Sequence, residues 1–180
     1  MPFEMIHFRD SEKIIRKKKL DRDVKATLEY IYDALQGSLY RGELLRQALE
    51  EMGWREAGVP LNILEGRRYT YRGMKKGIAI EGNFASFEYL LTGLARLQVG
   101  FDKKLIDTGI LMLTAARSEK SSLGTSRDLA MAEIEQLYPT ISMPVAIALF
   151  DLGAPVISDG EGEGGDENGI SVHADQKQDQ

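Results

Sequence analysis

Two almost wholly apolar segments constrain the fold of this chain more than any other feature of its sequence. They span residues 109–114 and 144–150, and a helical pattern over residues 127–138 lies between them. A strand that is apolar on both sides must have both faces of its sheet covered by other elements. Strands that alternate with helices are typical of α/β folds. The sequence therefore predicts an α/β fold with helices on both faces of a sheet.

Apolar residues at helical intervals predict three further helices. These helices cover residues 20–35, 44–52 and 84–101. Between the second and the third, a hairpin is expected, with strands at residues 68–72 and 77–83 joined by a turn at residues 73–76. The expected order of elements is therefore helix, helix, hairpin, helix, strand, helix, strand.

The C-terminal part of the chain differs from the rest in composition and charge. It is rich in Gly, Asp, Glu, Ser and Gln, and few of its residues could be buried, which predicts disorder. Residues 151–180 hold eight acidic residues and one lysine, a balance of −7, so the rest of the chain carries −5 minus −7, or +2. We expect one domain over residues 1–153 and a disordered acidic tail over residues 154–180. A weakly basic domain permits nucleic-acid binding.

The composition excludes several classes of function. The chain of 180 residues has no cysteine, and its two histidines, His7 and His173, lie near its ends. Disulfides and thiolate metal sites are therefore excluded, and neither a zinc centre built from histidines nor a Ser-His-Asp triad is expected. No segment has the apolar length that a membrane span needs. The sequence predicts a soluble, cytoplasmic protein without a membrane partner, whose chemistry would depend on carboxylates, amides, hydroxyls and lysines.

Two polar side chains near the end of the second hairpin strand form a candidate metal site. Side chains alternate along a strand, so Glu81 and Asn83 share one side of it. A carboxylate and a second oxygen ligand two residues apart can hold a hard cation such as Mg²⁺. This is half of the site that a metal-dependent phosphodiesterase needs. The alternative is that Glu81 only marks the place where the strand meets solvent.

Four short motifs resemble those of the BglII/BstYI-type restriction endonucleases, which belong to the PD-(D/E)XK nuclease superfamily. They occur in the family's order, and the resemblance extends over roughly residues 24–152, as counted from the helical patterns. The motifs are Gly53-Trp54, Ile78-Ala79-Ile80-Glu81-Gly82-Asn83-Phe84, residues 105–111 and residues 144–150. The resemblance implies a restriction-endonuclease-like core with a mixed β-sheet flanked by helices.

The resemblance also implies roles for individual residues. Glu81 would be a ligand of Mg²⁺, and Asn83 would orient the attacking water or contribute its carbonyl oxygen. The family pattern further calls for an Asp on the preceding hairpin strand, where Thr70 fits best. A neutral hydroxyl is a poor Mg²⁺ ligand, so the active site is degenerate unless Glu65 or Glu88 supplies the missing acid.

The segment between the two apolar strands is a candidate DNA contact. In the resembled enzymes the equivalent loop meets the target DNA. Its candidate DNA-binding residues are Arg117, Lys120, Ser122, Thr125, Ser126 and Arg127. Basic side chains there could bind phosphates, and arginine can pair with guanine. The alternative is a solvated loop in which Thr125 or Ser126 caps the next helix.

These observations predict a type II restriction-endonuclease-like protein that binds double-stranded DNA as a homodimer. If active, it would hydrolyse phosphodiesters with Mg²⁺. A two-fold dimer suits a palindromic site, and the helix at residues 20–35 is a candidate dimer face. Two alternatives stay open: a catalytically inactive DNA-binding or regulatory relative of the nucleases, and a protein-interaction module without a nucleic-acid role.

Overall fold

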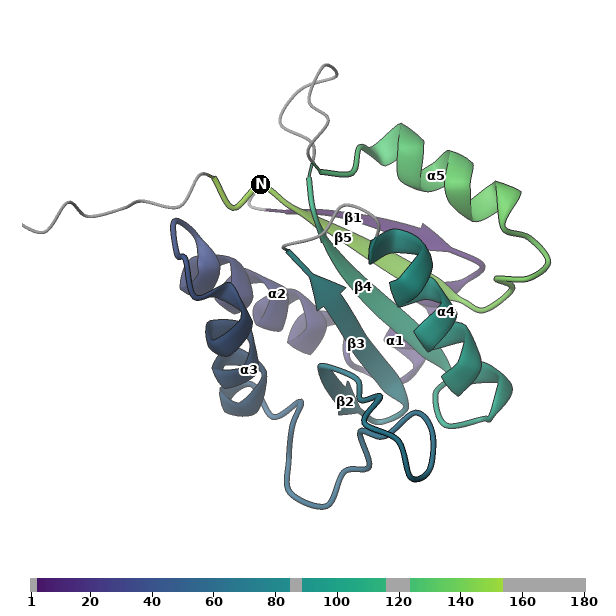
Figure 1. Cartoon of the computed structure of the whole chain (residues 1–180), viewed down its shortest axis with the longest axis horizontal. Helices are drawn as coiled ribbons and strands as arrows, with labels where there is room; N and C mark the ends of the chain where they lie inside the picture. Colours follow the sequence, from purple (N-terminus) through teal and green to yellow (C-terminus); the bar gives the residue numbers. More distant parts are fainter. Residues whose placement is uncertain (1–2, 85–88, 116–123, 154–180) are drawn as a thin grey trace, which may run out of the picture.

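A mixed five-stranded sheet forms the centre of the protein (Figure 1). The computed structural model describes residues 3–84, 89–115 and 124–153. The strands are β1 (Phe3–Phe8), β2 (Gly73–Lys75), β3 (Ile78–Asn83), β4 (Thr108–Thr114) and β5 (Val145–Phe150). They lie in the order β1-β5-β4-β3-β2. The three central strands are parallel, and each edge strand is antiparallel to its neighbour.

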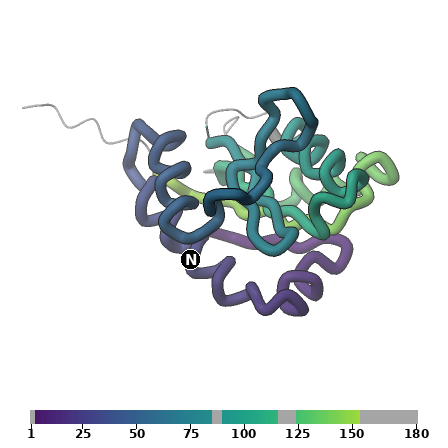
Figure 2. The backbone as a smooth tube through the Cα atoms, turned by 90° about the horizontal axis from the view of Figure 1, so that it is seen from below, coloured from purple at the N-terminus to yellow at the C-terminus, as the bar shows by residue number. Residues whose placement is uncertain are grey.

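Helices cover both faces of this sheet, as the two apolar segments predicted (Figures 1 and 2). One face carries α1 (Ser11–Lys17), α2 (Asp21–Leu35) and α3 (Arg41–Glu51); the other carries α4 (Tyr89–Asp102) and α5 (Arg127–Gln136). Side chains of the central strands alternate between the two cores. On β3, for example, Ile78 and Ile80 face α2 and α3, whereas Ala79 lies in the core beneath α4. The predicted α/β class is confirmed.

The four predicted helices are present, with ends shifted by a few residues. The sequence did not predict β1 or α1. The basic run at residues 16–19 is in part the last turn of α1, where Arg16 and Lys17 face the negative end of the helix dipole. Strand β1 escaped prediction because its side chains are only partly buried; Ile6 and Phe8 are its buried residues. As the edge strand of the sheet, it needs fewer apolar side chains than β4 or β5.

The predicted hairpin has the right second strand and the wrong first strand. Residues 69–71 pair with residues 61–63 of the preceding loop, through Tyr71 N to Leu61 O and Ile63 N to Tyr69 O, and not with β3. The strand that pairs with β3 is β2, three residues long. Its turn is Lys76-Gly77, and both residues have positive φ, as a two-residue hairpin turn requires.

Two other expectations concern the acidic tail and the absence of a membrane span, and the described residues test only the second. The acidic tail, residues 154–180, lies outside the described residues. Among the helices that the structure describes, none is both long and apolar enough to cross a bilayer.

Candidate functional site

Glu81 lies near the C-terminal end of β3, with its side chain completely buried beneath α4. The idea that Glu81 marks where the strand meets solvent is therefore wrong. Its Oε2 is 3.0 Å from Nε of Arg96, and its Oε1 is 3.7 Å from Nε of Arg72. The same Oε1 accepts a hydrogen bond from the backbone N–H of Gly82, at 3.1 Å. A buried carboxylate is tolerated only when it is paired and hydrogen-bonded, and Glu81 meets both conditions.

Arg96 links α4 to the segment that precedes β2. Its Nη2 donates to the carbonyl of Thr70 at 2.6 Å, and its own carbonyl accepts a hydrogen bond from the hydroxyl of Tyr71 at 3.2 Å. Arg96 lies between the buried residues Leu94 and Leu97, so the packing of α4 on the sheet brings its guanidinium to Glu81. Arg96 is therefore both the counterion of Glu81 and an anchor for residues 70–71.

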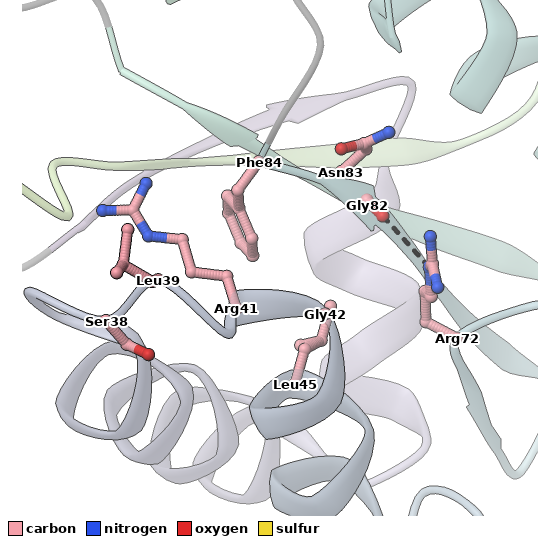
Figure 3. A pocket seen from close by; sticks show the side chains of 9 residues that line it. All are labelled: Ser38, Leu39, Arg41, Gly42, Leu45, Arg72, Gly82, Asn83 and Phe84. Atoms are coloured by element: carbon pink, nitrogen blue, oxygen red, sulfur yellow. Dashed lines mark hydrogen bonds between the residues drawn. The ribbon is translucent and has the colours of Figure 1, made fainter. Parts of the chain in front are cut away.

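Arg72 covers the open edge of β3 beyond the short strand β2. Its backbone N–H donates to Ile80 O at 2.9 Å, and its Nε donates to Gly82 O at 3.2 Å (Figure 3). Because β2 begins at Gly73, no strand is available to bond the Gly82 carbonyl on that side. The Arg72 side chain supplies the missing donor and places a guanidinium beside Glu81.

Tyr71 is buried under the same helix. Burial, and to a smaller extent the negative charge of Glu81, raise its pKa to about 12, against the opposing effect of the positive charge of Arg96. The phenol therefore stays neutral near pH 7 and remains a hydrogen-bond donor to Arg96. The Tyr71 ring also packs closely against α4, because a Cβ at Gly100 of this helix would lie 1.7 Å from the Tyr71 hydroxyl.

The described residues around Glu81 do not fit a Mg²⁺ site. Such a site needs oxygen ligands with converging negative charge. In the part of the chain that the structure describes, two guanidiniums face this one carboxylate, so these three side chains together carry a positive charge. Within residues 3–84, 89–115 and 124–153, no group of three His, Cys, Asp or Glu side chains could hold a metal ion.

The other predicted catalytic residues that the structure describes are less buried than Glu81. Thr70 is exposed and pairs with Asn62, outside the hairpin strand on which the family pattern places an acid. Glu65 is exposed on the loop before β2, whereas Glu81 is buried. Asn83 is half-buried at the end of β3, and Glu88 lies outside the described residues. The sequence missed Arg72 and Arg96.

The candidate DNA-binding residues are placed only in part. Arg117, Lys120 and Ser122 lie outside the described ranges. Ser126 caps α5, since its hydroxyl accepts a hydrogen bond from Leu129 N at 3.1 Å, which confirms the alternative of a helix cap. Thr125 is buried, with its N–H bonded to Thr114 O, so its side chain is not available to DNA. Arg127 forms an ion pair with Glu4 of β1.

A cleft between α3 and the edge of β3 was not predicted from the sequence. It consists of two adjoining cavities of about 270 and about 310 Å³, and Arg72 and Gly42 line both. The first cavity is drawn in Figure 3, where Arg41 and Arg72 lie on either side of Phe84 and Leu45. We call the two cavities together the arginine cleft. Its other basic residues, Arg46 and Arg55, line the second cavity.

The sheet topology, the helices on both faces and a polar site at the end of β3 define a restriction-endonuclease-like fold. Two solved structures share it. The crystal structure of the restriction endonuclease BglII complexed with a DNA 16-mer has a TM-score of 0.60 and 12% sequence identity, over 83% of this chain and 76% of that chain. Free BglII has a TM-score of 0.55 and 12% identity, over 83% of this chain and 79% of that chain. No family model and no curated protein sequence matches this chain. At this identity the likeness shows the fold alone.

Proposed function

We propose that this protein binds double-stranded DNA through its restriction-endonuclease-like fold and does not hydrolyse it. The observation that carries the proposal is the surroundings of Glu81. Its carboxylate is neutralised by Arg96 and approached by Arg72, so among the described residues its neighbours carry positive charge. Mg²⁺ would meet two guanidiniums there and would be repelled.

The DNA-binding part of the proposal has two supports. One is the fold, because a solved structure of the same fold holds a DNA 16-mer. The other is charge, since the chain up to residue 150 carries +2 although the whole chain carries −5. Basic side chains that neutralise phosphates release counterions, so binding must weaken as salt rises.

We expect no cleavage of supercoiled plasmid by the full chain with Mg²⁺ or Mn²⁺, and a mobility shift of duplex DNA that weakens with salt. Agarose gels check the cleavage result. Gel-shift assays check the binding result between about 50 and 200 mM salt, a range over which phosphate contacts weaken measurably. Cleavage that disappears in Glu81→Ala would overturn the non-catalytic part. If neither cleavage nor a mobility shift is observed, a protein-interaction module remains as the function.

We also propose a homodimer, but through a different helix from the one that the sequence suggested. The apolar stripe of residues 20–35 is buried in the core, where it packs on the sheet. It is therefore not available to a second copy. By contrast, Leu91, Ala95 and Val99 lie exposed at four-residue intervals on the outer face of α4, and Leu91 is 56% exposed. Such a stripe suits a helix-to-helix contact between two copies.

The substitution Leu91→Glu is expected to convert the dimer into a monomer, because it would bury a charge in each half of the contact. Sedimentation velocity of the wild type and the variant measures the change. The control is Arg22→Glu, an exposed position of α2 away from this stripe. A wild-type protein that is monomeric at all concentrations would contradict the dimer.

A further inference from the structure

The two cavities of the arginine cleft are joined at one side chain. Arg72 lines both cavities, together with Gly42 at the start of α3. The backbone of Arg72 is fixed from both directions, since its N–H donates to Ile80 O and its carbonyl accepts from Nη1 of Arg55 at 2.6 Å. The backbone that carries the Arg72 guanidinium is thus held in place, although the side chain is 43% exposed.

The hydrogen-bonding capacity of Arg72 is used only in part. Its Nε bonds to Gly82 O, and no hydrogen bond from either terminal nitrogen forms within the described part of the chain. An arginine side chain has five N–H donors in a planar fork, and four of them are on the terminal nitrogens. These four donors are available to a ligand in the cleft. A phosphate oxyanion matches such a fork, because it can accept two parallel hydrogen bonds.

The charges that line the cleft also favour an anion. Its basic residues are Arg41, Arg46, Arg55 and Arg72, and Glu43 is its one acidic residue within the described ranges. Arg46 is largely neutralised by Glu43 and Glu50, and Arg55 lies 3.5 Å from Glu50. The positive charge of the cleft therefore includes that of Arg72, because the nearby carboxylate of Glu81 already pairs with Arg96.

The beginning of α3 adds to this preference. Gly42 stands in its first turn, and the N-cap residue Tyr40 makes no side-chain hydrogen bond to the helix. A Cβ at Gly42 would meet nothing within 4 Å, so the backbone there is open to the cleft. Backbone N–H groups in the first turn have no partner within a helix, and the helix dipole favours negative charge beside them.

We infer that the arginine cleft is a metal-independent phosphate site, in which Arg72 donates a bidentate pair of hydrogen bonds to a phosphate of the DNA backbone beside the first turn of α3. This inference rests on the proposed DNA-binding function. The arginine that makes the site unfit for Mg²⁺ is, on this account, the group that replaces the metal as the partner of the phosphate. Arg72 acts here as a binding residue and takes no part in bond breaking.

The test compares Arg72→Gln and Arg72→Lys with the wild-type full chain, in buffer with EDTA. Arg72→Gln should weaken duplex binding about tenfold and flatten the dependence of log K on log salt by about one unit. Arg72→Lys keeps the charge and loses the fork, so it should keep the salt slope and bind a few-fold more weakly. Arg68→Gln is the matched control, because Arg68 is exposed on the same loop and lines neither cavity.

A second measurement separates this inference from the proposed function. Inorganic phosphate is titrated into the wild type, and the side-chain N–H signals of arginine are followed by NMR, with chloride as the reference anion. Saturable shifts of the other arginine signals that disappear in Arg72→Gln and need a few-fold more phosphate in Arg72→Lys support the site even if duplex DNA does not bind. If duplex DNA binds and Arg72→Gln binds it as tightly as Arg68→Gln does, the inference fails and DNA binding stands. Absence of phosphate-dependent shifts in the wild type also overturns it.

Discussion

Glu81→Ala is expected to lower the free energy of unfolding by about 3 kcal/mol, as removal of one partner of a buried ion pair does. The side chain of Glu81 is completely buried, and that of Arg96 is 25% exposed, so Arg96 would lose its counterion where water reaches it poorly. Because Arg96 keeps some access to solvent, we expect a value at the lower end of the usual range. Urea unfolding followed by fluorescence measures the loss.

This result would distinguish the present arrangement from a metal site. In a metal site without its ion, carboxylates repel one another, so removing one leaves stability unchanged or raises it. Here Glu81 stabilises the fold as a counterion. A variant as stable as the wild type would contradict the proposed role and favour a metal ligand. Glu65→Ala is the control, since Glu65 is exposed and its loss should change stability by no more than about 0.5 kcal/mol.

The double substitution Glu81→Leu with Arg96→Met sharpens the test. Replacing both members of a buried ion pair by apolar side chains of similar size often leaves the stability of the fold unchanged. We therefore expect the double variant to be more stable than Glu81→Ala. If the double variant lost as much stability as the two single variants lose together, relative to the wild type, Glu81 and Arg96 would not be energetically coupled.

Trp54→Ala is expected to cost about 3–5 kcal/mol of stability, the usual range for truncating a buried tryptophan. Trp54 is completely buried, and its indole N–H donates to the Thr27 hydroxyl of α2 at 2.8 Å. Its carbonyl accepts from Met74 N of β2, and a Cβ at Gly73 would come within 2.9 Å of its own Cβ. Trp54 therefore joins α2 and the segment after α3 to β2, and β2 directly follows Arg72.

The same variant should weaken duplex binding if it folds, because Arg72 would lose the support of β2. Thermal unfolding and gel shifts on one preparation measure both effects. Trp54→Phe is the milder companion: it keeps most of the packing and leaves the Thr27 hydroxyl without its donor, for a loss of about 1 kcal/mol. If Trp54→Ala unfolded at the wild-type temperature, the packing described here would be wrong.

The fold could be predicted from the sequence because apolar periodicity records which faces of each element are buried. The runs that became β4 and β5 required cover on two sides, and the structure provides it. Periodicity does not record which strand pairs with which. Residues 68–72 have the composition of a strand, but residues 69–71 pair with residues 61–63 instead of with β3. The turn Lys76-Gly77 was the better signal, since both of its residues need positive φ.

The candidate site was predictable at one residue and not at its partners. Glu81 stood out as a carboxylate at the end of an apolar run. Arg96 could have been noticed as a charged residue within the apolar helix α4, between Leu94 and Leu97. No spacing rule connects it to Glu81, because their contact depends on how α4 crosses the sheet. Arg72 reaches Gly82 only because β2 ends the ladder at Gly73.

The outermost strand β1 has a consequence for how the protein avoids association. It pairs with β5 from Phe3 opposite Phe150 to Phe8 opposite Val145, so the two strands come from opposite ends of the domain. All six residues of β5 are buried. Until β1 docks, the backbone of an entirely apolar strand stays open along one side, and such an edge can add a strand from another molecule. By pairing with β5, β1 therefore covers the edge that could otherwise add a strand from another molecule. In a newly made chain, β1 can do so only after β5 has been synthesised, because β5 lies near the other end of the domain.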